Sequence, residues 1–267
     1  MVINTNMAAI TSANNLDQST NLLNESLARL SSGSKIVNPS DNPAGLAESI
    51  SLGAQINQTA AANANVSNAV SFLQTQDGYL QQVGSALDQM STLAVESQDV
   101  TKTNTERADY QQEFNTLAGY ITDTATKDFN GVSLFDGSTL AVTTDAEGAL
   151  FQMTGVNLGA AAYTAATAAD VSTTTGAVAA LTAVTSAITQ LATDRATIGA
   201  NEERLTYTGD ELGVLQDNLT AANSQLTDVD VATESTNYAK YQILVQSGVS
   251  MLAQANQNPQ TVLKLLS

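Results

Sequence analysis

The sequence predicts a mainly α protein, an elongated coiled-coil helical rod with paired N- and C-terminal helices and a small β-hairpin region in the middle. Three observations support this prediction. Apolar residues recur at every seventh position in both halves of the chain, which is the spacing of a coiled-coil seam. Aromatic residues make up only 4% of the 267 residues and tryptophan is absent, so the bulky side chains of a compact interior are missing. Between the two halves, residue pairs that end in glycine and favour turns replace the seven-residue spacing.

The N-terminal segment predicts a helix that needs a partner. Its apolar heptad rows consist of Ile3, Ile10, Leu16, Leu23 and Leu30, with Leu27 beside them. At the other end of the chain, a second row consists of Val231, Tyr238, Val245 and Leu252. An isolated helix of this length is marginal in water and exposes its apolar stripe. We therefore expect the two terminal segments to pair with each other.

A helix break follows the first segment. Two of the three prolines stand close together here, at Pro39 and Pro43, and they push the residues before them away from α geometry. Gly33 can adopt the left-handed conformation that ends a helix. Ser40 or Asp41 is then placed to cap the helix that follows.

The strongest heptad row predicts one long helix over residues 45–98. The row consists of Val66, Leu73, Leu80, Leu87 and Ala94, accompanied by Ala69, Val83 and Met90. At about 1.5 Å per residue, such a helix is on the order of 80 Å long. A shorter helix is predicted over residues 106–126, where one apolar face consists of Tyr110, Phe114, Leu117 and Ile121. An aromatic stripe at this spacing is more often core than ligand site.

The middle of the chain predicts short antiparallel strands. Asn130-Gly131, Asp136-Gly137 and Glu147-Gly148 stand between short apolar runs, and such pairs form the turns of hairpins. One or two β-hairpins are therefore expected. The low-complexity stretch AAAYTAATAADVSTTTGA that follows is either a loop or a short helix.

A second long helix is predicted over residues 180–226. Its heptad row consists of Val184, Leu191, Ile198, Leu205, Leu212, Leu219 and Leu226, with Leu181, Ile188, Leu215 and Ala222 at alternate positions. Arg195, Glu202 and Gly209 interrupt the alternate row, so we expect a weaker seam in the middle of this helix.

The connection after the second long helix carries two carboxylates. These are Asp228 and Asp230, which follow Thr227 and precede the last helix. Helix capping explains them better than calcium binding, because the other ligands and the glycine of a calcium loop are missing.

The composition excludes most enzyme chemistry and several classes of partner. The chain has no histidine and no cysteine, so it cannot form a zinc site of the usual kind, a Ser-His-Asp triad, a thiol nucleophile or a disulfide. We expect neither enzymatic activity nor a cofactor. The net charge of −17 would repel nucleic acid and anionic lipid. No run approaches the roughly 18 consecutive apolar residues of a membrane-spanning helix, and the start lacks the pattern of a Sec-type leader, so a membrane is not an expected partner.

Four stretches of the chain carry a family resemblance. They read VINTNMAAITSANNLDQS, LARLSSGSKIVNPSDNPAGLAES, NAVSFLQTQDGYLQQVGSALDQMSTLAV and SGVSMLAQANQNPQTVLKLLS. These stretches resemble bacterial flagellin, the subunit of the flagellar filament. The resemblance covers residues 1–137 and 180–267, whereas residues 138–179 match no pattern of the family.

The resemblance implies a division of the chain into five segments. They are residues 1–40 as the N-terminal helix of an inner coiled-coil domain, 41–137 as the N-terminal part of a rod domain with two helices and the start of a β-hairpin, 138–179 as a short variable outer segment, 180–226 as the C-terminal long helix of the rod domain, and 227–267 as the C-terminal helix of the inner domain. The connection between the inner and rod domains is implied to be a hinge, built from Gly33, Pro39, Asp41, Pro43, Gly45 and Asp228.

The implied function is that of a structural protein. The chain would be exported unfolded by the flagellar type III apparatus, secreted, and self-assembled into the extracellular bacterial flagellum for swimming motility. Its implied partners are further copies of itself, an export chaperone, the filament cap protein and hook-filament junction proteins. The residues implied in self-assembly are Ile3, Ile10, Leu16, Leu23, Leu27, Leu30, Val245, Val249, Leu252, Val262, Leu263, Leu265 and Leu266.

A host receptor is a further implied partner. Animal Toll-like receptors sense many flagellins at a motif resembling QRVRELAVQ, and the aligned segment here reads DQMSTLAVE. The implied receptor contacts are Gln89 and Leu93, with Glu113 on the next helix. Because both arginines of the motif are replaced, their bidentate hydrogen bonds are lost and we expect weakened recognition.

Three rival functions fit the sequence less well. The alternative within the family is a hook-filament junction adaptor, which self-polymerisation of the purified protein would exclude. A chemoreceptor hairpin is also rich in heptads of small residues, but it needs a sensor or anchor and a helical tip, where this chain has strand-like sequence. A peptidase-bearing flagellin of the zinc type requires histidines, which this chain lacks.

Overall fold

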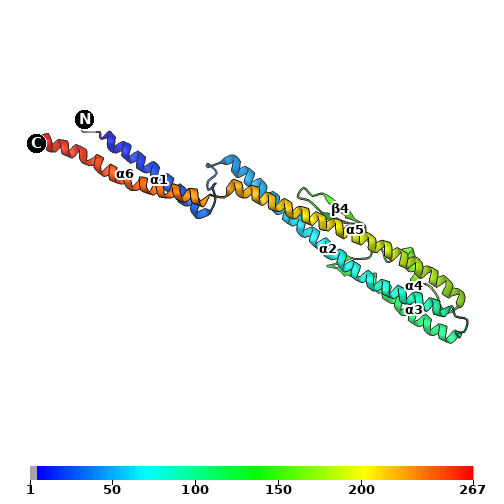
Figure 1. The fold of residues 1–267 in the computed structure, drawn as a ribbon. Coiled ribbons are helices and arrows are strands. Elements are labelled where there is room, and N and C mark those ends of the chain that lie inside the picture. The colour runs from blue at the N-terminus through cyan, green and yellow to red at the C-terminus, as the bar shows by residue number, and fades with distance from the viewer. Residues whose placement is uncertain (1–4, 267) are drawn as a thin grey trace. The chain divides into compact units, whose positions relative to one another are not determined.

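The computed structural model describes residues 5–266 of the chain, with side chains described for residues 5–257. Within this range the chain is mainly α, which confirms the predicted fold class (Figure 1). The helices are α1 (Met7–Ser32), α2 (Pro43–Ser97), α3 (Asn104–Thr124), α4 (Ala161–Thr167), α5 (Thr174–Thr227) and α6 (Val231–Leu266). The strands are β1 (Asp128–Phe129), β2 (Val132–Ser133), β3 (Leu140–Thr143) and β4 (Leu150–Met153).

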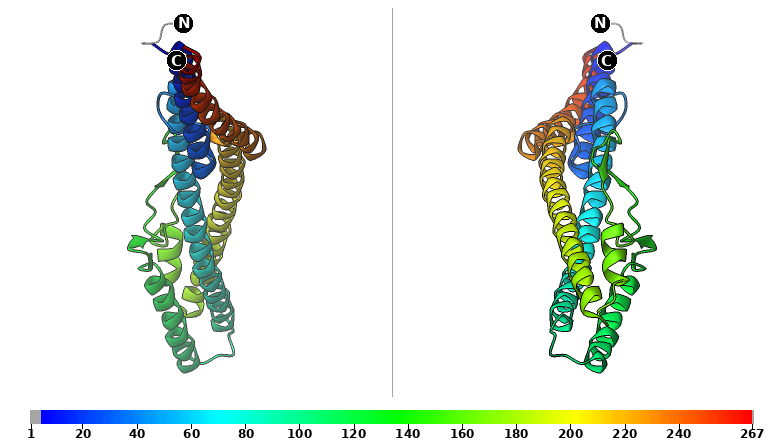
Figure 2. Two further views of the ribbon diagram at one scale, coloured as in Figure 1. Left: turned by 90° about the vertical axis from the view of Figure 1, so that its left-hand side faces the viewer. Right: turned by 90° about the vertical axis from the view of Figure 1, so that its right-hand side faces the viewer.

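The chain divides into two compact units. The terminal unit consists of residues 1–55 and 218–267, and the central unit consists of residues 56–217. Both boundaries fall inside the long helices α2 and α5, so each long helix contributes to both units. In the central unit, α2 and α5 run side by side and α3 lies against α4 (Figure 2).

The core of the central unit is built from the predicted heptad rows. The buried residues of α2 in these rows are Val66, Ala69, Leu73, Leu80, Val83, Leu87, Met90 and Ala94. The buried residues of the α5 row are Val184, Leu191, Ile198, Leu205 and Leu212. The alternate row of α5 was predicted less well, because Leu215 and Ala222 are exposed to solvent. The core instead takes the small residues Ala177, Ala180 and Ala187 at the start of α5, which lets the helices approach closely.

Polar contacts between α2 and α5 occupy the positions where a weak seam was predicted. Arg195 binds Asp77 through two hydrogen bonds, of 2.7 Å from Nε and 3.2 Å from the guanidinium NH2 group. Gln74 Nε2 donates a 2.7 Å hydrogen bond to Glu202. The Arg195 bond also lowers the pKa of the Asp77 carboxyl. Such exposed pairs contribute little stability, but they fix the register of the two helices.

The helix α3 closes over the end of α2. Thr103 and Glu106 form a capping box at its start. Phe114 and Ile121 are buried, as the predicted apolar face requires. The buried Arg107 donates a 2.9 Å hydrogen bond from Nε to the carbonyl oxygen of Ser97, which ties α3 to the last turn of α2.

The β region forms two small antiparallel sheets, β1–β2 and β3–β4. Asn130 and Gly131 connect β1 to β2 with φ angles of 53° and 80°, the signature of the tight turn predicted from this pair. Gly148 also has a positive φ, of 88°, and lies between β3 and β4. Gly137 has a φ of 79° but joins no hairpin, because its N–H bonds to the carbonyl oxygen of Val156 instead.

The low-complexity stretch was expected to be either a loop or a short helix. Part of it forms the short helix α4. Its Tyr163 is buried, and the phenol donates a 2.7 Å hydrogen bond to Asp194 Oδ2 on α5. Burial raises the pKa of Tyr163 above its ordinary value of 10.0, and the bond to Asp194 raises it further.

Tyr163 is expected to make the central unit sensitive to alkali. A group whose pKa is higher in the folded state stabilises the fold fully below its unfolded pKa and loses that contribution above it. The free energy of unfolding should therefore fall as the pH rises above 10.0, the ordinary pKa of tyrosine. Urea unfolding at a series of pH values should show a shallower fall for Tyr163→Phe. The exposed Tyr120→Phe serves as the control and should retain the full fall.

The helix α5 has an apolar window that the sequence analysis did not anticipate. Among the described residues it is the one helix long and apolar enough, by length and composition alone, to cross a membrane. The sequence prediction concerned an unbroken apolar run, which α5 does not contain. Its alanines, valines and leucines instead raise the average hydropathy of a window that also holds polar residues. Only 28% of the 18-residue window is buried in the structure.

Candidate assembly surface

The terminal helices α1 and α6 pair antiparallel, as predicted (Figure 1). Asn6 Nδ2 donates a 2.7 Å hydrogen bond to the carbonyl oxygen of Ala255, and Ser26 Oγ donates a 3.3 Å bond to that of Glu234. Between these two contacts, Gly248 lies so close to Leu16 that a Cβ on the glycine would come within 3.2 Å of the leucine. The chain therefore brings together residues from near its two ends.

Side chains cap the ends of both terminal helices. Asn6 accepts a 3.2 Å hydrogen bond from the backbone N–H of Ala9 at the start of α1. Asp230 accepts bonds of 3.0 Å and 3.3 Å from the N–H groups of Ala232 and Thr233 at the start of α6. The hydroxyl and N–H of Thr233 lower the pKa of Asp230. Asp230 is thus a helix cap, and no group of three or more side chains in the described part of the chain could hold a metal ion.

The terminal unit leaves its apolar side chains largely uncovered. Among its described side chains, no leucine, isoleucine, valine, methionine or aromatic residue is buried. The predicted assembly residues Ile10, Leu27 and Val249 are 46%, 50% and 54% exposed. The predicted assembly residues that are half-buried, and that we assign to the seam between the two helices, are Leu16, Leu23, Leu30, Val245 and Leu252. One stripe of each helix is therefore satisfied within the chain, and the opposite face is not.

Four more exposed apolar residues of α1 and α6 stand outside the predicted rows and were missed. They are Met7, Ile243, Leu244 and Met251. Met251 follows Leu244 by seven residues and Ile243 by eight, which places the three on one face of α6. A search for a second heptad row in this helix would have found them. Of the other predicted assembly residues, Ile3 lies outside the described residues. The side chains that also lie outside them are those of Val262, Leu263, Leu265 and Leu266.

The connections next to the terminal helices are hydrogen-bonded to each other. Ser34 and Asp228 form an antiparallel β-bridge. The N–H of Lys35 donates a 2.6 Å bond to the carbonyl oxygen of Thr227, and the N–H of Val229 donates a 3.0 Å bond to that of Gly33. The predicted hinge residues Gly33 and Asp228 thus lie in the same pair of bonded segments, with Gly33 bonded to Val229 and Asp228 paired with Ser34, although they are far apart in the sequence.

The cap of α2 corrects one prediction. Asn42, and not Ser40 or Asp41, caps this helix by accepting a 3.0 Å hydrogen bond from the N–H of Gly45. The reason is that Pro43 takes the first helical position, which makes the residue before it the N-cap. Asp41 instead accepts bonds of 3.0 Å and 2.9 Å from the N–H groups of Val37 and Asn38.

Two other predicted hinge residues can be placed around this cap. The two backbone bonds to Asp41, that of Asn38 foremost, lower the pKa of its carboxyl. A Cβ on the buried Gly45 would come within 2.5 Å of Asn42 Nδ2, so glycine leaves room for the cap. Pro39 is exposed in the turn before it.

Gly33 is expected to be sensitive to substitution. It ends α1 in the left-handed conformation, with φ 71°, and its N–H donates a 2.9 Å bond to the carbonyl oxygen of Arg29. Gly33→Ala should lower the midpoint of thermal unfolding of α1, because a Cβ costs about 1–2 kcal/mol in this conformation. Gly53→Ala is the matched control, since Gly53 lies inside α2 with open space around it. Circular dichroism should show a lower midpoint for Gly33→Ala only, and equal midpoints would contradict the assignment.

The residues implied in receptor contact are split between surface and core. Gln89 on α2 and Glu113 on α3 are exposed. Leu93 is only 7% exposed and packs in the core of the central unit. Val95, two residues later, is the exposed apolar residue of this segment.

Comparison with known proteins identifies the family of the chain. Residues 3–139 match the model of the bacterial flagellin N-terminal helical region, and residues 181–266 match that of the C-terminal helical region. Flagellin from Halalkalibacterium halodurans is 35% identical over the whole of both chains. The flagellar filament 33 kDa core protein of Treponema phagedenis is 32% identical, and flagellin from Bacillus subtilis is 31% identical, again over the whole of each chain.

Two solved structures share the fold. The crystal structure of Bacillus cereus flagellin matches with a TM-score of 0.50 and 23% identity, over 56% of this chain and 88% of that one. A structure from Vibrio parahaemolyticus described as a flagellar hook-associated protein matches with a TM-score of 0.59 and 15% identity, over 70% of this chain and all of that one. At these identities the two structures support the fold alone. Through its matches to both family models and to full-length relatives, the chain belongs to the bacterial flagellin family.

Proposed function

We propose that this chain is the structural subunit of a bacterial flagellar filament. The observation that carries the proposal is the uncovered apolar surface of the terminal unit, where none of the large apolar side chains that the structure describes is buried. The names of relatives support it, since one is a flagellar filament core protein and others are flagellins. A filament is a setting in which such a surface is covered by copies of the same chain.

Burial of this surface provides the driving force for assembly. A fully buried leucine or valine side chain contributes about 1.5–3 kcal/mol. Subunits related by a helical operation meet through different surfaces, so the contact does not close and copies add without limit. Neither step involves bond chemistry, and the chain functions as a structural protein rather than an enzyme.

The five segments implied by the resemblance give the proposed layout in the filament. Residues 1–40 and 227–267 form the inner domain, residues 41–137 and 180–226 form the rod domain, and residues 138–179 form the outer segment. The compact terminal unit reaches further into the sequence than the proposed inner domain, because it includes the first turns of α2 and the last turns of α5.

Export and accessory partners complete the proposed function. The filament lies outside the cell, so the subunit is secreted, and we assign its export to the flagellar type III apparatus as an unfolded chain. An export chaperone covers the terminal apolar surface before secretion. The filament cap protein acts at the growing end, and hook-filament junction proteins meet the first subunits.

Seeded polymerisation tests the proposed function. Purified full-length monomer is mixed with sheared filament fragments and followed by sedimentation and electron microscopy. The expected result is long filaments with a critical concentration. A monomer that remains single at high concentration, with or without seeds, would contradict the proposal and would instead agree with a junction adaptor.

Weak signalling through the host receptor is a further expected result. The segment DQMSTLAVE lacks arginine, and its Leu93 faces the core. We therefore expect a lower potency in Toll-like receptor reporter cells than for a flagellin that carries both arginines. A titration with equal potency for the two proteins would contradict this expectation.

A further inference from the structure

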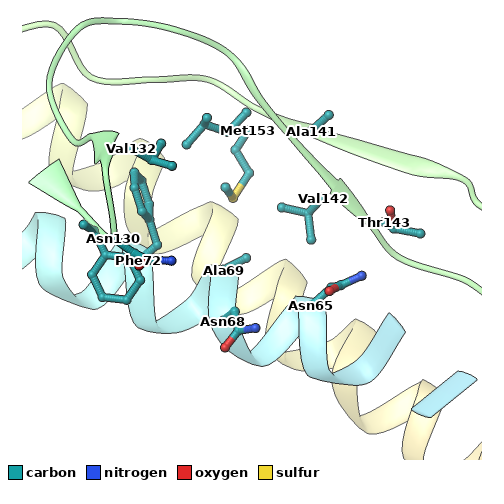
Figure 3. Close-up of a pocket in the computed structure, with 12 residues that line it drawn as sticks. Asn65, Asn68, Ala69, Phe72, Asn130, Val132, Ala141, Val142, Thr143 and Met153 are labelled. Atoms are coloured by element: carbon teal, nitrogen blue, oxygen red, sulfur yellow. The ribbon is translucent and has the colours of Figure 1, made fainter. Parts of the chain in front are cut away.

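An open groove of about 670 Å³ lies on one side of the central unit, between α2 and the β region (Figure 3). Asn65, Asn68, Ala69 and Phe72 of α2 form one side of it. The residues that line it from the β region are Phe129, Asn130, Val132, Leu140, Ala141, Val142, Thr143 and Met153. Figure 3 shows Met153 and Val142 directed from the strands toward α2.

The groove carries no charged residue, although the chain has a net charge of −17. The uncharged lining reflects the sequence, because residues 49–76 contain no Asp, Glu, Lys or Arg. Among the described residues, the side-chain amides of Asn65, Asn68 and Asn130 make no hydrogen bond. The groove therefore offers an apolar floor and free neutral donors and acceptors at its rim.

A second uncharged surface lies on α5. Residues 171–193 contain no charged residue, and this run coincides with the apolar part of the helix that is mostly unburied. On its outer face Val178 is 54% exposed. We name the face formed by Thr174, Thr175, Val178, Ala179 and Thr182 the α5 patch.

The hydroxyl of Thr182 in the α5 patch is already satisfied within its own helix. Thr182 Oγ1 donates a 3.1 Å hydrogen bond to the carbonyl oxygen of Val178, and Thr185 and Thr189 make the same bond to the residue four positions before them. A hydroxyl bonded within its own helix loses little when water is removed. The part of the α5 patch around Val178, Ala179 and Thr182 therefore presents mainly methyl groups and behaves as an apolar surface.

We propose that the α5 patch of one copy docks in the groove of the next copy within the filament. This inference rests on the proposed function and adds a contact of the central unit to that of the terminal helices. Two chains of charge −17 repel each other, so uncharged surfaces are the places where they can approach most closely. The groove and the α5 patch are the uncharged surfaces that this contact joins.

The positions of the two surfaces make the contact open-ended. Gln98 at the end of α2 donates a 3.5 Å hydrogen bond to the carbonyl oxygen of Ala177, so the α5 patch lies beside this end. The groove lies on α2 near Ala69, about 40 Å away at about 1.5 Å per residue. The α5 patch and the groove lie at different positions along the long helices. When the patch of one copy docks in the groove of a second copy, the first copy keeps a free groove and the second keeps a free patch, so further copies can add.

A membrane is the competing explanation for the apolar window of α5. The heptad row of this helix, including Val184 and Leu191, is buried against α2, so the helix cannot insert alone without breaking the core. Incubation of the monomer with phosphatidylcholine vesicles should therefore give no co-sedimentation. Co-sedimentation that Val178→Glu abolishes would overturn the proposal.

Cysteine cross-linking tests the contact directly, because the natural chain has no cysteine. The variant Asn68→Cys/Val178→Cys is polymerised on seeds and mildly oxidised. The expected product is a ladder of multimers on a denaturing gel, removed by reductant, since each copy would be linked to two others. The matched control Asn68→Cys/Thr206→Cys places the second thiol farther along the exposed side of α5 and should give no ladder.

The outcomes separate this inference from the proposed function. If the cysteine-free chain does not polymerise, the proposed function fails. A different outcome is that both double variants polymerise and yet give no ladder, or give ladders of equal strength. Either result would show that the docking contact is wrong, while the proposed filament function would remain supported.

Should the cysteine variants not polymerise, a charge variant decides the question. Asn68→Asp should raise the critical concentration at least tenfold by placing a charge in the groove. Asn115→Asp on α3 should behave as the parent chain, because its side-chain oxygen can still accept the bond from Gln111. Equal critical concentrations for the two aspartate variants would overturn the proposal.

Discussion

Replacement of both Leu27 and Val249 by aspartate is expected to abolish filament formation while leaving the monomer folded. The two side chains are 50% and 54% exposed in the monomer, so little of its own packing is lost. In the filament, their remaining surface would be buried, and the loss of that burial together with the cost of two buried charges amounts to about 3 kcal/mol or more. Since about 1.4 kcal/mol corresponds to a factor of ten, the critical concentration should rise about a hundredfold or more.

The measurement is seeded sedimentation, accompanied by circular dichroism of the monomer. Thr206→Asp is the control, because it adds a charge at an exposed position of the central unit beside Glu202 and Glu203. It should polymerise as the parent chain does. A double aspartate variant that polymerises normally would show that the exposed faces of α1 and α6 remain uncovered in the filament, and the proposed assembly surface would be wrong.

Phe114→Ala is expected to produce the largest loss of stability. Phe114 on α3 is 0% exposed and lies in the core of the central unit with Ile121 and the buried rows of α2 and α5. Truncation of a buried phenylalanine removes apolar burial and leaves a cavity, which typically costs about 3–5 kcal/mol. The midpoint of urea unfolding, followed by circular dichroism, should fall accordingly.

Tyr120→Ala provides the matched control on the same helix. Tyr120 is 41% exposed, so its truncation should cost about 1 kcal/mol or less. Similar losses for the two variants would mean that α3 is not held by the apolar face that its helical spacing predicts. The contrast therefore tests the packing of the central unit independently of assembly.

The heptad rows predicted the central unit well because both partners of the seam belong to the same chain. Leu80 and Leu87 are fully buried for this reason. In the terminal unit the same rule located only the seam between α1 and α6, which half-buries Leu16 and Val245. The second apolar stripe, with Ile243 and Met251, does not pack within the described chain, so a search for one seam per helix overlooked it.

Local turn and cap chemistry was predicted in kind but not always in place. Asp41 and Asn42 are both good capping residues, and only the position of Pro43 at the first turn of α2 selects Asn42. Asp136-Gly137 was expected to behave like Asn130-Gly131, and both glycines do have positive φ. Such a pair indicates that the backbone turns, but not which segments pair on either side of it.

The candidate docking groove was invisible to motif reasoning because it contains no reactive or charged group. The sequence indicates it only through what is missing: residues 49–76 and 171–193 carry no charge in a strongly acidic chain. Only the fold shows that the first of these runs meets the β hairpins. Charge-free runs in an acidic chain are therefore worth marking before a structure is known.

The β-bridge between Ser34 and Asp228 has a mechanical consequence for a filament subunit under load. Hydrogen bonds of an antiparallel bridge lie across the direction of the two backbones. Tension along either connection therefore loads the bonds at Lys35 and Val229 in shear, so that they resist together rather than opening one after the other. A load on the terminal unit at this point would therefore be shared by both connections, the one after α1 and the one before α6.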